Sequence, residues 1–349
     1  MTQHSSHNIS GWDIGGAHIK VARCNSKGEL INIIQVACPL WLGIEHLEQA
    51  IEAVFQQLNN RDDIAAITMT GELVDIFPDR QAGVNGILLC LSQYINRDKI
   101  HVYAAEAGWL TPSQAQQQWQ QVASRNWQAS ATLVAQYVAN GLFVDIGSTT
   151  CDIIPFSHGQ AKPQGFDDFQ RQTHRELLYT GAIRTPLISL GQYAPFNGAL
   201  TGLAAELFAT TGDCWTLLGK LDPNSIQDSS ADGQAWQAAY CRSRIARLLG
   251  TDSNQASTEQ WQQLARWFAE QQVHLITLAV LQVLSSQAET SLNSPLIGAG
   301  VGRFIVKMCA QRLDLPYQDF AEIISSNDAK TADHAPAVAV ALLAQQKLT

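Results

Sequence analysis

Two segments of this chain repeat one pattern: an apolar strand, Asp-Ile-Gly, a few small residues, and a second strand. The first is Gly11-Trp-Asp-Ile-Gly-Gly-Ala-His-Ile-Lys20, and the second is Leu142-Phe-Val-Asp-Ile-Gly-Ser-Thr-Thr-Cys-Asp152. A strand that ends in Asp-Ile-Gly and turns into another strand places glycine where the backbone can approach an anion with free N–H groups. The pair therefore predicts two hairpins that close on one polyphosphate.

The acidic residue at each strand end would repel phosphate if it touched it directly. We expect it instead to hold a hydrated Mg²⁺ that binds phosphate oxygens. Asp13 and Asp145 are therefore candidate metal ligands, and Asp145 is also a candidate catalytic residue. The groups expected to bind phosphate itself belong to Gly15, Gly16, Gly147, Ser148, Thr149 and Thr150.

A single Asp-Ile-Gly is a common strand-to-turn sequence and would be weak support for a site. Two copies with the same flanks are harder to dismiss. A third element, Pro295-Leu-Ile-Gly-Ala-Gly-Val-Gly-Arg-Phe304, runs from an apolar strand through a glycine turn into a helix. Its glycines Gly298, Gly300 and Gly302 stand where a nucleotide-binding fold places a nucleotide loop.

These three elements together resemble the actin, sugar kinase and Hsp70 superfamily, in which two phosphate hairpins and a glycine-rich adenosine loop occur in this order. The resemblance implies an α/β fold of two ribonuclease-H-like halves with a cleft between them. We expect the first half at residues 1–138 and the second at 139–334, with a helical insertion in the second half and the helix at 335–349 returning to the first half. A length of 349 residues agrees with two cores.

A narrower resemblance rests on Thr70–Asp75, Asn126-Trp127, Asp145–Pro155, Tyr179–Pro186 and Ala205–Ala209. This set is similar to the hydantoinase/oxoprolinase-related proteins of the tetrahydromethanopterin-linked C1 transfer pathway, which include the condensing enzyme of methanofuran biosynthesis. The resemblance implies a transferase that joins an organic diphosphate, an aminomethylfuran-methyl diphosphate, to the phenol oxygen of γ-glutamyltyramine or a tyrosine-derived analogue. The product is an aryl ether, and diphosphate is released.

A phenol has a pKa of about 10, so a phenolate near pH 7 costs roughly 4 kcal/mol and requires a base. The candidates, in descending preference, are Asp152, Glu72 and Glu176, and Glu72 could instead cap a helix after Thr70. Lys20 could reach a phosphate or be a solvated charge on an edge strand.

Arg184 could bind a phosphate or a glutamyl carboxylate, or form an interdomain ion pair. Asp232 is a weaker candidate, because Ser229-Ser-Ala-Asp-Gly233 only partly matches a Thr-Ala-Asp-Gly segment of the family. His18 replaces the asparagine usual in relatives.

Mg²⁺ is the expected cofactor, and ATP binding is left open because the glycine loop need not hold adenine if the substrate is itself a diphosphate. The first alternative function is an ATP-dependent small-molecule kinase or a hydantoinase/oxoprolinase-type hydrolase. The second is a nucleotide-gated interaction protein like the chaperone and actin branches. Fold analogy alone does not choose among them.

Composition limits the partners. A net charge of −9 and a pI near 5.4 argue against nucleic acid or an anionic membrane as the main partner, because both need a basic face. Seven cysteines without a Cys-x-x-Cys pair suggest reduced thiols. With a polar start and no long apolar run, we expect a cytoplasmic protein, with monomer and homodimer both open.

Local patterns predict strands at Ile9–Ile14, Ile19–Arg23, Leu30–Ala37 and Ile64–Met69, and an amphipathic helix at Glu45–Leu58. The second half begins with another strand meander from Gly141. The stretch from Ala231 to Ala288 is mostly helical by pattern. We expect a helix at Arg303–Leu313, a short strand at Ala321–Ser325 and a final helix at Ala335–Gln346.

Overall fold

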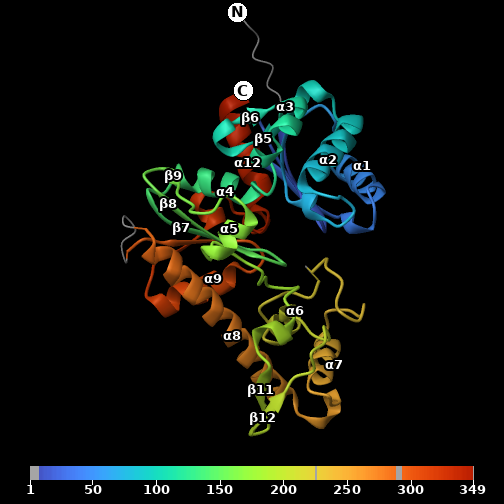
Figure 1. Cartoon of the computed structure of the whole chain (residues 1–349), viewed down its shortest axis with the longest axis vertical. Helices are drawn as coiled ribbons and strands as arrows, with labels where there is room; N and C mark the ends of the chain where they lie inside the picture. The colour runs from blue at the N-terminus through green and yellow to red at the C-terminus, as the bar shows by residue number, and fades with distance from the viewer. Residues whose placement is uncertain (1–7, 225, 288–292, 349) are drawn as a thin grey trace, which may run out of the picture. The chain divides into compact units, whose positions relative to one another are not determined.

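The computed structural model describes residues 8–224, 226–287 and 293–348, and the chain divides into two compact units (Figure 1). Unit 1 contains the residues up to Asn140, the short segment Phe156–Lys162 and the residues from Phe320 onward. Unit 2 contains Gly141–Pro155 and Pro163–Asp319. Each unit has its own mixed sheet and its own hydrophobic core.

The sheet of unit 1 has the strand order β3-β2-β1-β4-β5-β6. β1 pairs in parallel with β4, and β4 with β5, while the other neighbours are antiparallel. The carboxyl ends of β1 and β4 therefore lie side by side. The strands are β1 (Ile9–Ile14), β2 (His18–Cys24), β3 (Leu30–Ala37), β4 (Ile64–Met69), β5 (Ile100–Tyr103) and β6 (Trp109–Leu110).

Helices cover the sheet of unit 1. α1 buries Leu47, Ile51 and Val54, the helical spacing that predicted it, in one core with Trp12 of β1. The alanine-rich α12, red in Figure 1, packs against β1, β2 and α4, so the end of the chain completes the unit that its beginning starts. The elements are α1 (Glu45–Leu58), α2 (Arg80–Tyr94), α3 (Pro112–Gln117), α4 (Asn126–Ala135), β9 (Gln160–Ala161), α10 (Phe320–Ile323), α11 (Lys330–Asp333) and α12 (Ala335–Leu348).

The strand predicted at Ala321–Ser325 is wrong. These residues begin within α10, and Ser325 has a left-handed backbone with φ of 56°. The strand lies just upstream, at β14 (Tyr317–Asp319), where it pairs in parallel with β13 (Leu296–Ala299). A short apolar run fits a buried helix turn as well as a strand, and here the pairing with β13 decides.

The sheet of unit 2 has the order β10-β8-β7-β13-β14. The last two residues of β8, Phe156 and Ser157, belong to unit 1 and pair there with β9. β13 pairs in parallel with both β7 and β14, as β4 does with β1 and β5. The strand arrangement of unit 1 is thus repeated, which agrees with the predicted second meander. The further strands are β7 (Asn140–Ile146), β8 (Cys151–Ser157), β10 (Leu177–Leu178) and a separate ribbon of β11 (Tyr193–Phe196) and β12 (Ala199–Gly202).

The longest helix of unit 2 is α8, orange in Figure 1, which contacts α9 and also the ribbon strand β11. A capping box starts it, because Ser257 and Gln260 satisfy each other's backbone amides. α7 and α8 lie in the stretch predicted to be helical, whose last residue, Ala288, is outside the described part. The helices are α5 (Asp168–Thr173), α6 (Thr211–Leu217), α7 (Ala238–Leu248), α8 (Thr258–Ser285) and α9 (Arg303–Leu313).

All seven cysteines are buried and none forms a disulfide. Among the described residues, no helix combines the length and the apolar character needed to cross a membrane.

Candidate functional site: two anion-binding turns

The turn between β1 and β2 is closed by a hydrogen bond from the Gly15 amide to the His18 carbonyl, at 3.0 Å. The carbonyls of Gly16 and Ala17 accept hydrogen bonds from the amides of Leu40 and Cys38, at 3.0 and 2.8 Å. Within the described part of the chain, the amides of Gly16 and Ala17 have no hydrogen-bond partner. In this turn the carbonyls of Gly16 and Ala17 are therefore hydrogen-bonded, whereas their N–H groups remain able to bind an acceptor.

The turn between β7 and β8 is built in the same way. The Gly147 amide donates to the Thr150 carbonyl at 2.9 Å. The Gly147 carbonyl accepts from Ala182, and the Ser148 carbonyl accepts from Ile183 and Arg184, at 2.8 to 3.1 Å. The amides of Ser148, Thr149 and Thr150 have no partner among the residues that the structure describes, and all three residues are half-buried.

A turn with free N–H groups and occupied carbonyls is the arrangement that binds anions. In each unit a separate loop ties the carbonyls back: Cys38–Leu40 in unit 1 and Ala182–Arg184 in unit 2. Sequence reasoning named the turns but missed both supporting loops. The loop Ala182–Arg184 lies inside Tyr179–Pro186, one of the motifs of the family resemblance, so the sequence did point to it. Cys38–Leu40 belongs to none of those motifs.

Asp13 lies at the carboxyl end of β1 and is 6% exposed. Its Oδ1 lies 3.5 Å from Nδ2 of Asn126, at the start of α4. Its register partner on β4 is Thr68, whose buried Oγ1 has no hydrogen-bond partner in the described ranges. Because buried polar atoms are nearly always satisfied, Thr68 indicates a water or ligand atom next to Asp13.

Asp145 has the equivalent place at the end of β7 and is half-buried. No cluster of three or more His, Cys, Asp or Glu side chains suited to a metal occurs among the described residues. Mg²⁺ is usually held by one or two carboxylates together with substrate phosphates and water. Asp13 beside the first turn and Asp145 beside the second fit that kind of site.

The glycine loop packs directly on the end of β7. A Cβ at Gly300, where φ is 78°, would lie 2.2 Å from the Ile146 carbonyl and 2.4 Å from Oδ1 of Asp145. A Cβ at Gly298 would meet the Tyr317 ring, and one at Gly302 would meet the Ile146 side chain. Packing therefore accounts for all three glycines without a nucleotide.

Of the predicted bases, Asp152 lies on β8 two residues beyond the second turn. Its side chain is 18% exposed and accepts a hydrogen bond from Arg171 at 2.8 Å. Burial raises the pKa of the Asp152 carboxyl, and the charge and hydrogen bond of Arg171 oppose that rise in part. A raised pKa brings a carboxylate closer to the value a general base needs near neutral pH.

The other two predicted bases are more deeply buried, each at 1% exposed. Glu176 accepts hydrogen bonds from the amides of Gln164 and Gly165 at 2.7 and 3.0 Å, which anchors that loop, and burial raises its pKa. Glu72 stands in a short 3-10 turn after β4 and accepts a hydrogen bond from Oγ of Ser124 at 2.7 Å.

Two predicted cations flank the turns. Arg184 donates its backbone amide to the second turn, and its side chain is 43% exposed with Nε 4.0 Å from Asp228 of the same unit. Lys20 is half-buried on β2, opposite Asp13 in register. β2 lies between β1 and β3 and is not an edge strand, which removes the argument for a solvated edge charge.

His334, between α11 and α12, lies close enough to Lys20 to feel its charge. The side chain is 7% exposed, and its Nδ1 has no hydrogen-bond partner among the described residues. Burial lowers the pKa of His334 from 6.5 to about 3, with Lys20 and Lys330 adding to the effect and the backbone of Asp333 and the charge of Asp328 opposing it. The imidazole is therefore neutral at pH 7.

Unfolding restores the ordinary pKa of His334. Between pH 6.5 and about 3, the unfolded chain therefore binds a proton at this residue and the folded chain does not. This group's contribution to stability is complete above pH 6.5 and falls toward pH 3, by about 1.4 kcal/mol per pH unit. We expect His334→Asn to flatten the stability profile between pH 6.5 and 4 in urea unfolding. The control His158→Asn, at an exposed site, should keep the wild-type slope.

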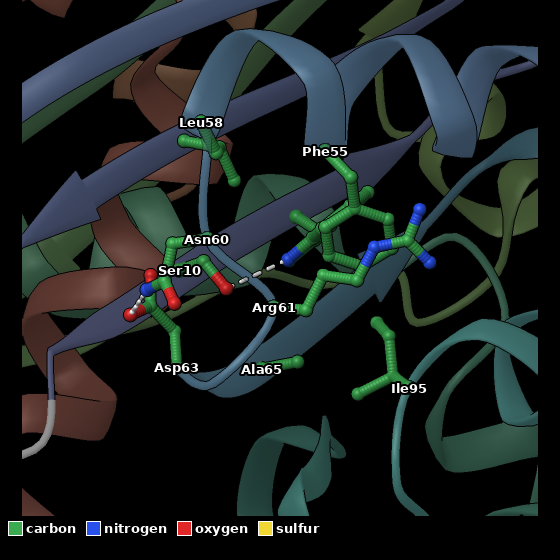
Figure 2. Close-up of a pocket in the computed structure, with 9 residues that line it drawn as sticks. Ser10, Phe55, Leu58, Asn60, Arg61, Asp63, Ala65 and Ile95 are labelled. Carbon is green, nitrogen blue, oxygen red and sulfur yellow. Dashed lines mark hydrogen bonds between the residues drawn. The ribbon is translucent and has the colours of Figure 1, made fainter.

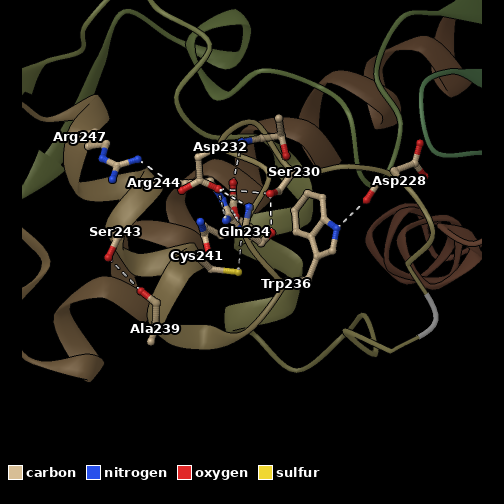
Figure 3. A network of polar contacts seen from close by, with 12 residues as sticks. Asp228, Ser230, Asp232, Gln234, Trp236, Ala239, Cys241, Ser243, Arg244 and Arg247 are labelled. Carbon is tan, nitrogen blue, oxygen red and sulfur yellow. Dashed lines mark hydrogen bonds and ion pairs between the residues drawn. The ribbon is translucent and has the colours of Figure 1, made fainter. Parts of the chain in front are cut away.

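Asp232, the weakest candidate, belongs to a structural network (Figure 3). It accepts hydrogen bonds from Arg244 at 2.8 Å and Arg247 at 3.3 Å. Arg244 is fully buried, also pairs with Asp213 at 2.7 Å, and lies over the Trp236 ring. The partners of Asp232 favour a role in holding the loop before α7.

A pocket in unit 1 lies away from the turns (Figure 2). Its volume is about 10 Å³, close to the minimum for a single water. It cannot hold a diphosphate or a nucleotide. Its lining is Ser10, Trp12, Phe55, Leu58, Asn60, Arg61, Asp63, Ala65 and Ile95.

Comparison with known proteins identifies relatives. The pattern of the hydantoinase/oxoprolinase family matches residues 63–347. Two curated relatives are named (4-{4-[2-(gamma-L-glutamylamino)ethyl]phenoxymethyl}furan-2-yl)methanamine synthase. The protein of Methanocaldococcus jannaschii is 31% identical over 245 residues, which cover 70% of this chain and 72% of the relative. That of Methanococcus vannielii is 33% identical over 178 residues, which cover 51% and 78%.

Solved structures share the fold at low identity. A nucleotide-free acetone carboxylase has a TM-score of 0.58 at 10% identity, covering 96% of this chain and 70% of that one. A ROK family glucokinase from Streptomyces griseus has a TM-score of 0.50 at 13% identity, covering 98% and 100%. The predicted fold class, the α/β fold of the actin-like ATPases, is confirmed.

Proposed function

This chain belongs to the hydantoinase/oxoprolinase family, and from that premise we propose that it forms an aryl ether in the assembly of a methanofuran-type cofactor. The name of the two relatives describes a product in which a phenol oxygen is joined to a furan-methyl carbon. The proposed substrates are an aminomethylfuran-methyl diphosphate and the phenol of γ-glutamyltyramine or a tyrosine analogue.

In the proposed reaction, the bond between the furan-methyl carbon and the diphosphate oxygen breaks, and diphosphate leaves with the electron pair. The phenol oxygen forms the new bond to that carbon, and its proton passes to a base. The furan ring stabilises positive charge on the methyl carbon. The protein's main task is therefore to stabilise the charge that develops on the leaving diphosphate.

The observation that carries this proposal is the pair of turns with uncommitted amides. Ser148, Thr149 and Thr150 offer three N–H groups at one turn, and Gly16 and Ala17 offer two at the other. Their geometry is fixed by the loops that hold the carbonyls, so little reorganisation is needed when charge develops. The loss of one such donor typically slows a reaction about 10²–10³-fold.

Cations near the turns add to this stabilisation. Lys20 and Arg184 are the side chains proposed to contact phosphate oxygens. Asp13 at the first turn and Asp145 at the second are each proposed as a ligand of Mg²⁺, which when bound would supply positive charge to the diphosphate.

Among the three candidate bases, Asp152 is the one we propose to take the phenol proton. It is more exposed than Glu72 and Glu176, so a substrate can reach it. Its raised pKa also favours proton acceptance. Glu176 already binds two backbone amides, and Glu72 binds Ser124.

The test is incubation with the furan diphosphate, γ-glutamyltyramine and Mg²⁺, followed by mass spectrometry for the ether and an assay for diphosphate. We expect the two products in equal amounts. The corresponding furan alcohol, which lacks the leaving group, should give none. Release of ADP from ATP in place of ether formation would overturn the proposal in favour of a kinase or an ATP-dependent hydrolase.

A further inference from the structure

We infer that Gln272, on the long helix α8, positions the second anion-binding turn and so sets the affinity for the leaving diphosphate. The inference rests on the proposed function, because it concerns the turn proposed to bind that group. It assigns a role to a buried side chain that touches neither the turn nor a substrate. Gln272 acts through Thr180 and Gly181.

Gly181 is in close contact with the second turn. A Cβ at Gly181 would lie 2.4 Å from the carbonyl of Ser148 and from the amide nitrogen of Thr149. The Gly181 backbone thus lies directly against the peptide that joins these two residues. Any shift of Gly181 must move that peptide or lose contact with it.

Hydrogen bonds hold both backbone groups of Gly181. Its carbonyl accepts hydrogen bonds from Nε2 of Gln272 at 2.7 Å and from Oγ1 of Thr211 at 2.9 Å, with Oγ1 of Thr185 at 3.1 Å. Its amide donates to Oγ1 of Thr185 at 2.8 Å. Gln272 Nε2 also donates to Oγ1 of Thr180 at 3.0 Å. Thr180 and Gly181 are therefore held by side chains from two other segments, α6 and α8, and by Thr185 of their own loop.

Trp215 fixes the orientation of the Gln272 side-chain amide. Oε1 of Gln272 accepts a hydrogen bond from Nε1 of Trp215 at 2.8 Å. An indole N–H can only donate, so the oxygen must face Trp215 and the NH₂ group must face Thr180 and Gly181. Gln272 is fully buried and Trp215 is 1% exposed, so water cannot take the place of either contact easily.

The sequence gives a weak indication that Gln272 has a special role. Gln272 falls at a buried helical position beside Phe268, Val273 and Ile276, where an apolar side chain is the norm. A polar residue on the buried face of a helix has to find partners inside the protein. Here the partners include Thr180 and Gly181, and Gly181 lies directly against the second turn.

Replacement of Gln272 with glutamate keeps the shape and removes the NH₂ donor. A carboxylate oxygen would then face the Gly181 carbonyl and repel it. We expect Gln272→Glu to weaken the binding of inorganic diphosphate with Mg²⁺ by roughly ten- to hundredfold in calorimetry, the loss typical of one disrupted charge-assisted hydrogen bond. We also expect faster deuterium exchange at the amides of Ala182–Arg184, which donate to the turn.

Two variants on α8 serve as controls. Gln262→Glu makes the same chemical change at an exposed glutamine whose Nε2 donates to the Leu217 carbonyl. Thr277→Val removes a buried hydrogen bond, to the Val273 carbonyl, and controls for a general loss of stability. Both should bind diphosphate like the wild type and keep slow exchange at Ala182–Arg184.

Unchanged exchange at Ala182–Arg184 in a folded Gln272→Glu variant would overturn the inference, as would faster exchange with unchanged diphosphate affinity. If Thr277→Val weakened diphosphate binding as much as Gln272→Glu, the effect of Gln272 would be one of general stability, and the inference would be wrong. If Gln272→Glu does not fold, Gln272→Met is measured in its place against the same outcomes. A wild-type chain that does not bind diphosphate would overturn the proposed function, and exchange alone would then decide whether Gln272 holds the loop.

Discussion

Replacing Asp145 with asparagine is expected to reduce kcat/KM for ether formation by about 10²–10³-fold, the effect of losing a main stabiliser of developing charge. Asparagine has the same shape, so the close packing of Gly300 on the end of β7 is kept. What is lost is the charge proposed to hold Mg²⁺ at the second turn. The variant should therefore remain folded but lose most of its response to added Mg²⁺.

The measurement is steady-state ether formation across a Mg²⁺ titration, with thermal unfolding recorded on the same samples. Asp314→Asn is the control, because Asp314 is an exposed residue of the same unit with a left-handed backbone, which asparagine tolerates. It should match the wild type in both measurements. Full activity and an unchanged Mg²⁺ requirement in Asp145→Asn would exclude Asp145 from the site.

Replacing Arg244 with leucine is expected to destabilise the protein by about 3–5 kcal/mol, because it leaves the carboxylate of Asp213 buried without its partner. Both side chains are almost fully buried and lie 2.7 Å apart. The same change removes the hydrogen bond to Asp232 and the contact with the Trp236 ring (Figure 3). Urea unfolding measures the loss.

Arg247→Leu is the matched control on the same helix. Arg247 is 54% exposed and bonds the same Asp232 at 3.3 Å, so its loss should cost less than about 1 kcal/mol. Adding Asp213→Asn to Arg244→Leu should restore part of the stability, because asparagine removes the buried charge and can still cap the Thr210 amide. A double variant no more stable than Arg244→Leu would contradict the buried-charge explanation.

Much of the local structure could be predicted from periodicity. The bounds of β1, β3, β4 and α1 agree with the prediction, because apolar runs that end at turn residues and a helical spacing of apolar residues are local signals. The error at Ala321–Ser325 came from a segment too short to show a period. The strand of this region is instead β14, which pairs with β13, and a local pattern does not contain that pairing.

The two turns of the candidate site could be predicted from the sequence, because Asp-Ile-Gly between two strands is a local pattern typical of a strand-turn-strand hairpin. The supports of those turns could not. Cys38–Leu40 and Ala182–Arg184 act through backbone amides, whose hydrogen bonds do not depend on residue type. Likewise, the packing of the glycines at 298, 300 and 302 against Ile146 and Tyr317 could not be read from their spacing, and whether this loop binds a nucleotide stays a prediction.

The amino-acid sequence by itself determined the duplicated strand-turn-strand pattern and its two acidic strand ends, since these depend on the chemistry and spacing of neighbouring residues. The fold class was implied by the family resemblance that these motifs carry. Only the tertiary structure decided which donors at the turns stay free, that Asp232 is committed to arginines of α7, and that Gln272 holds Gly181. Those properties depend on groups far apart in the chain. Folding brings them to hydrogen-bond distance, and no local sequence pattern records that approach.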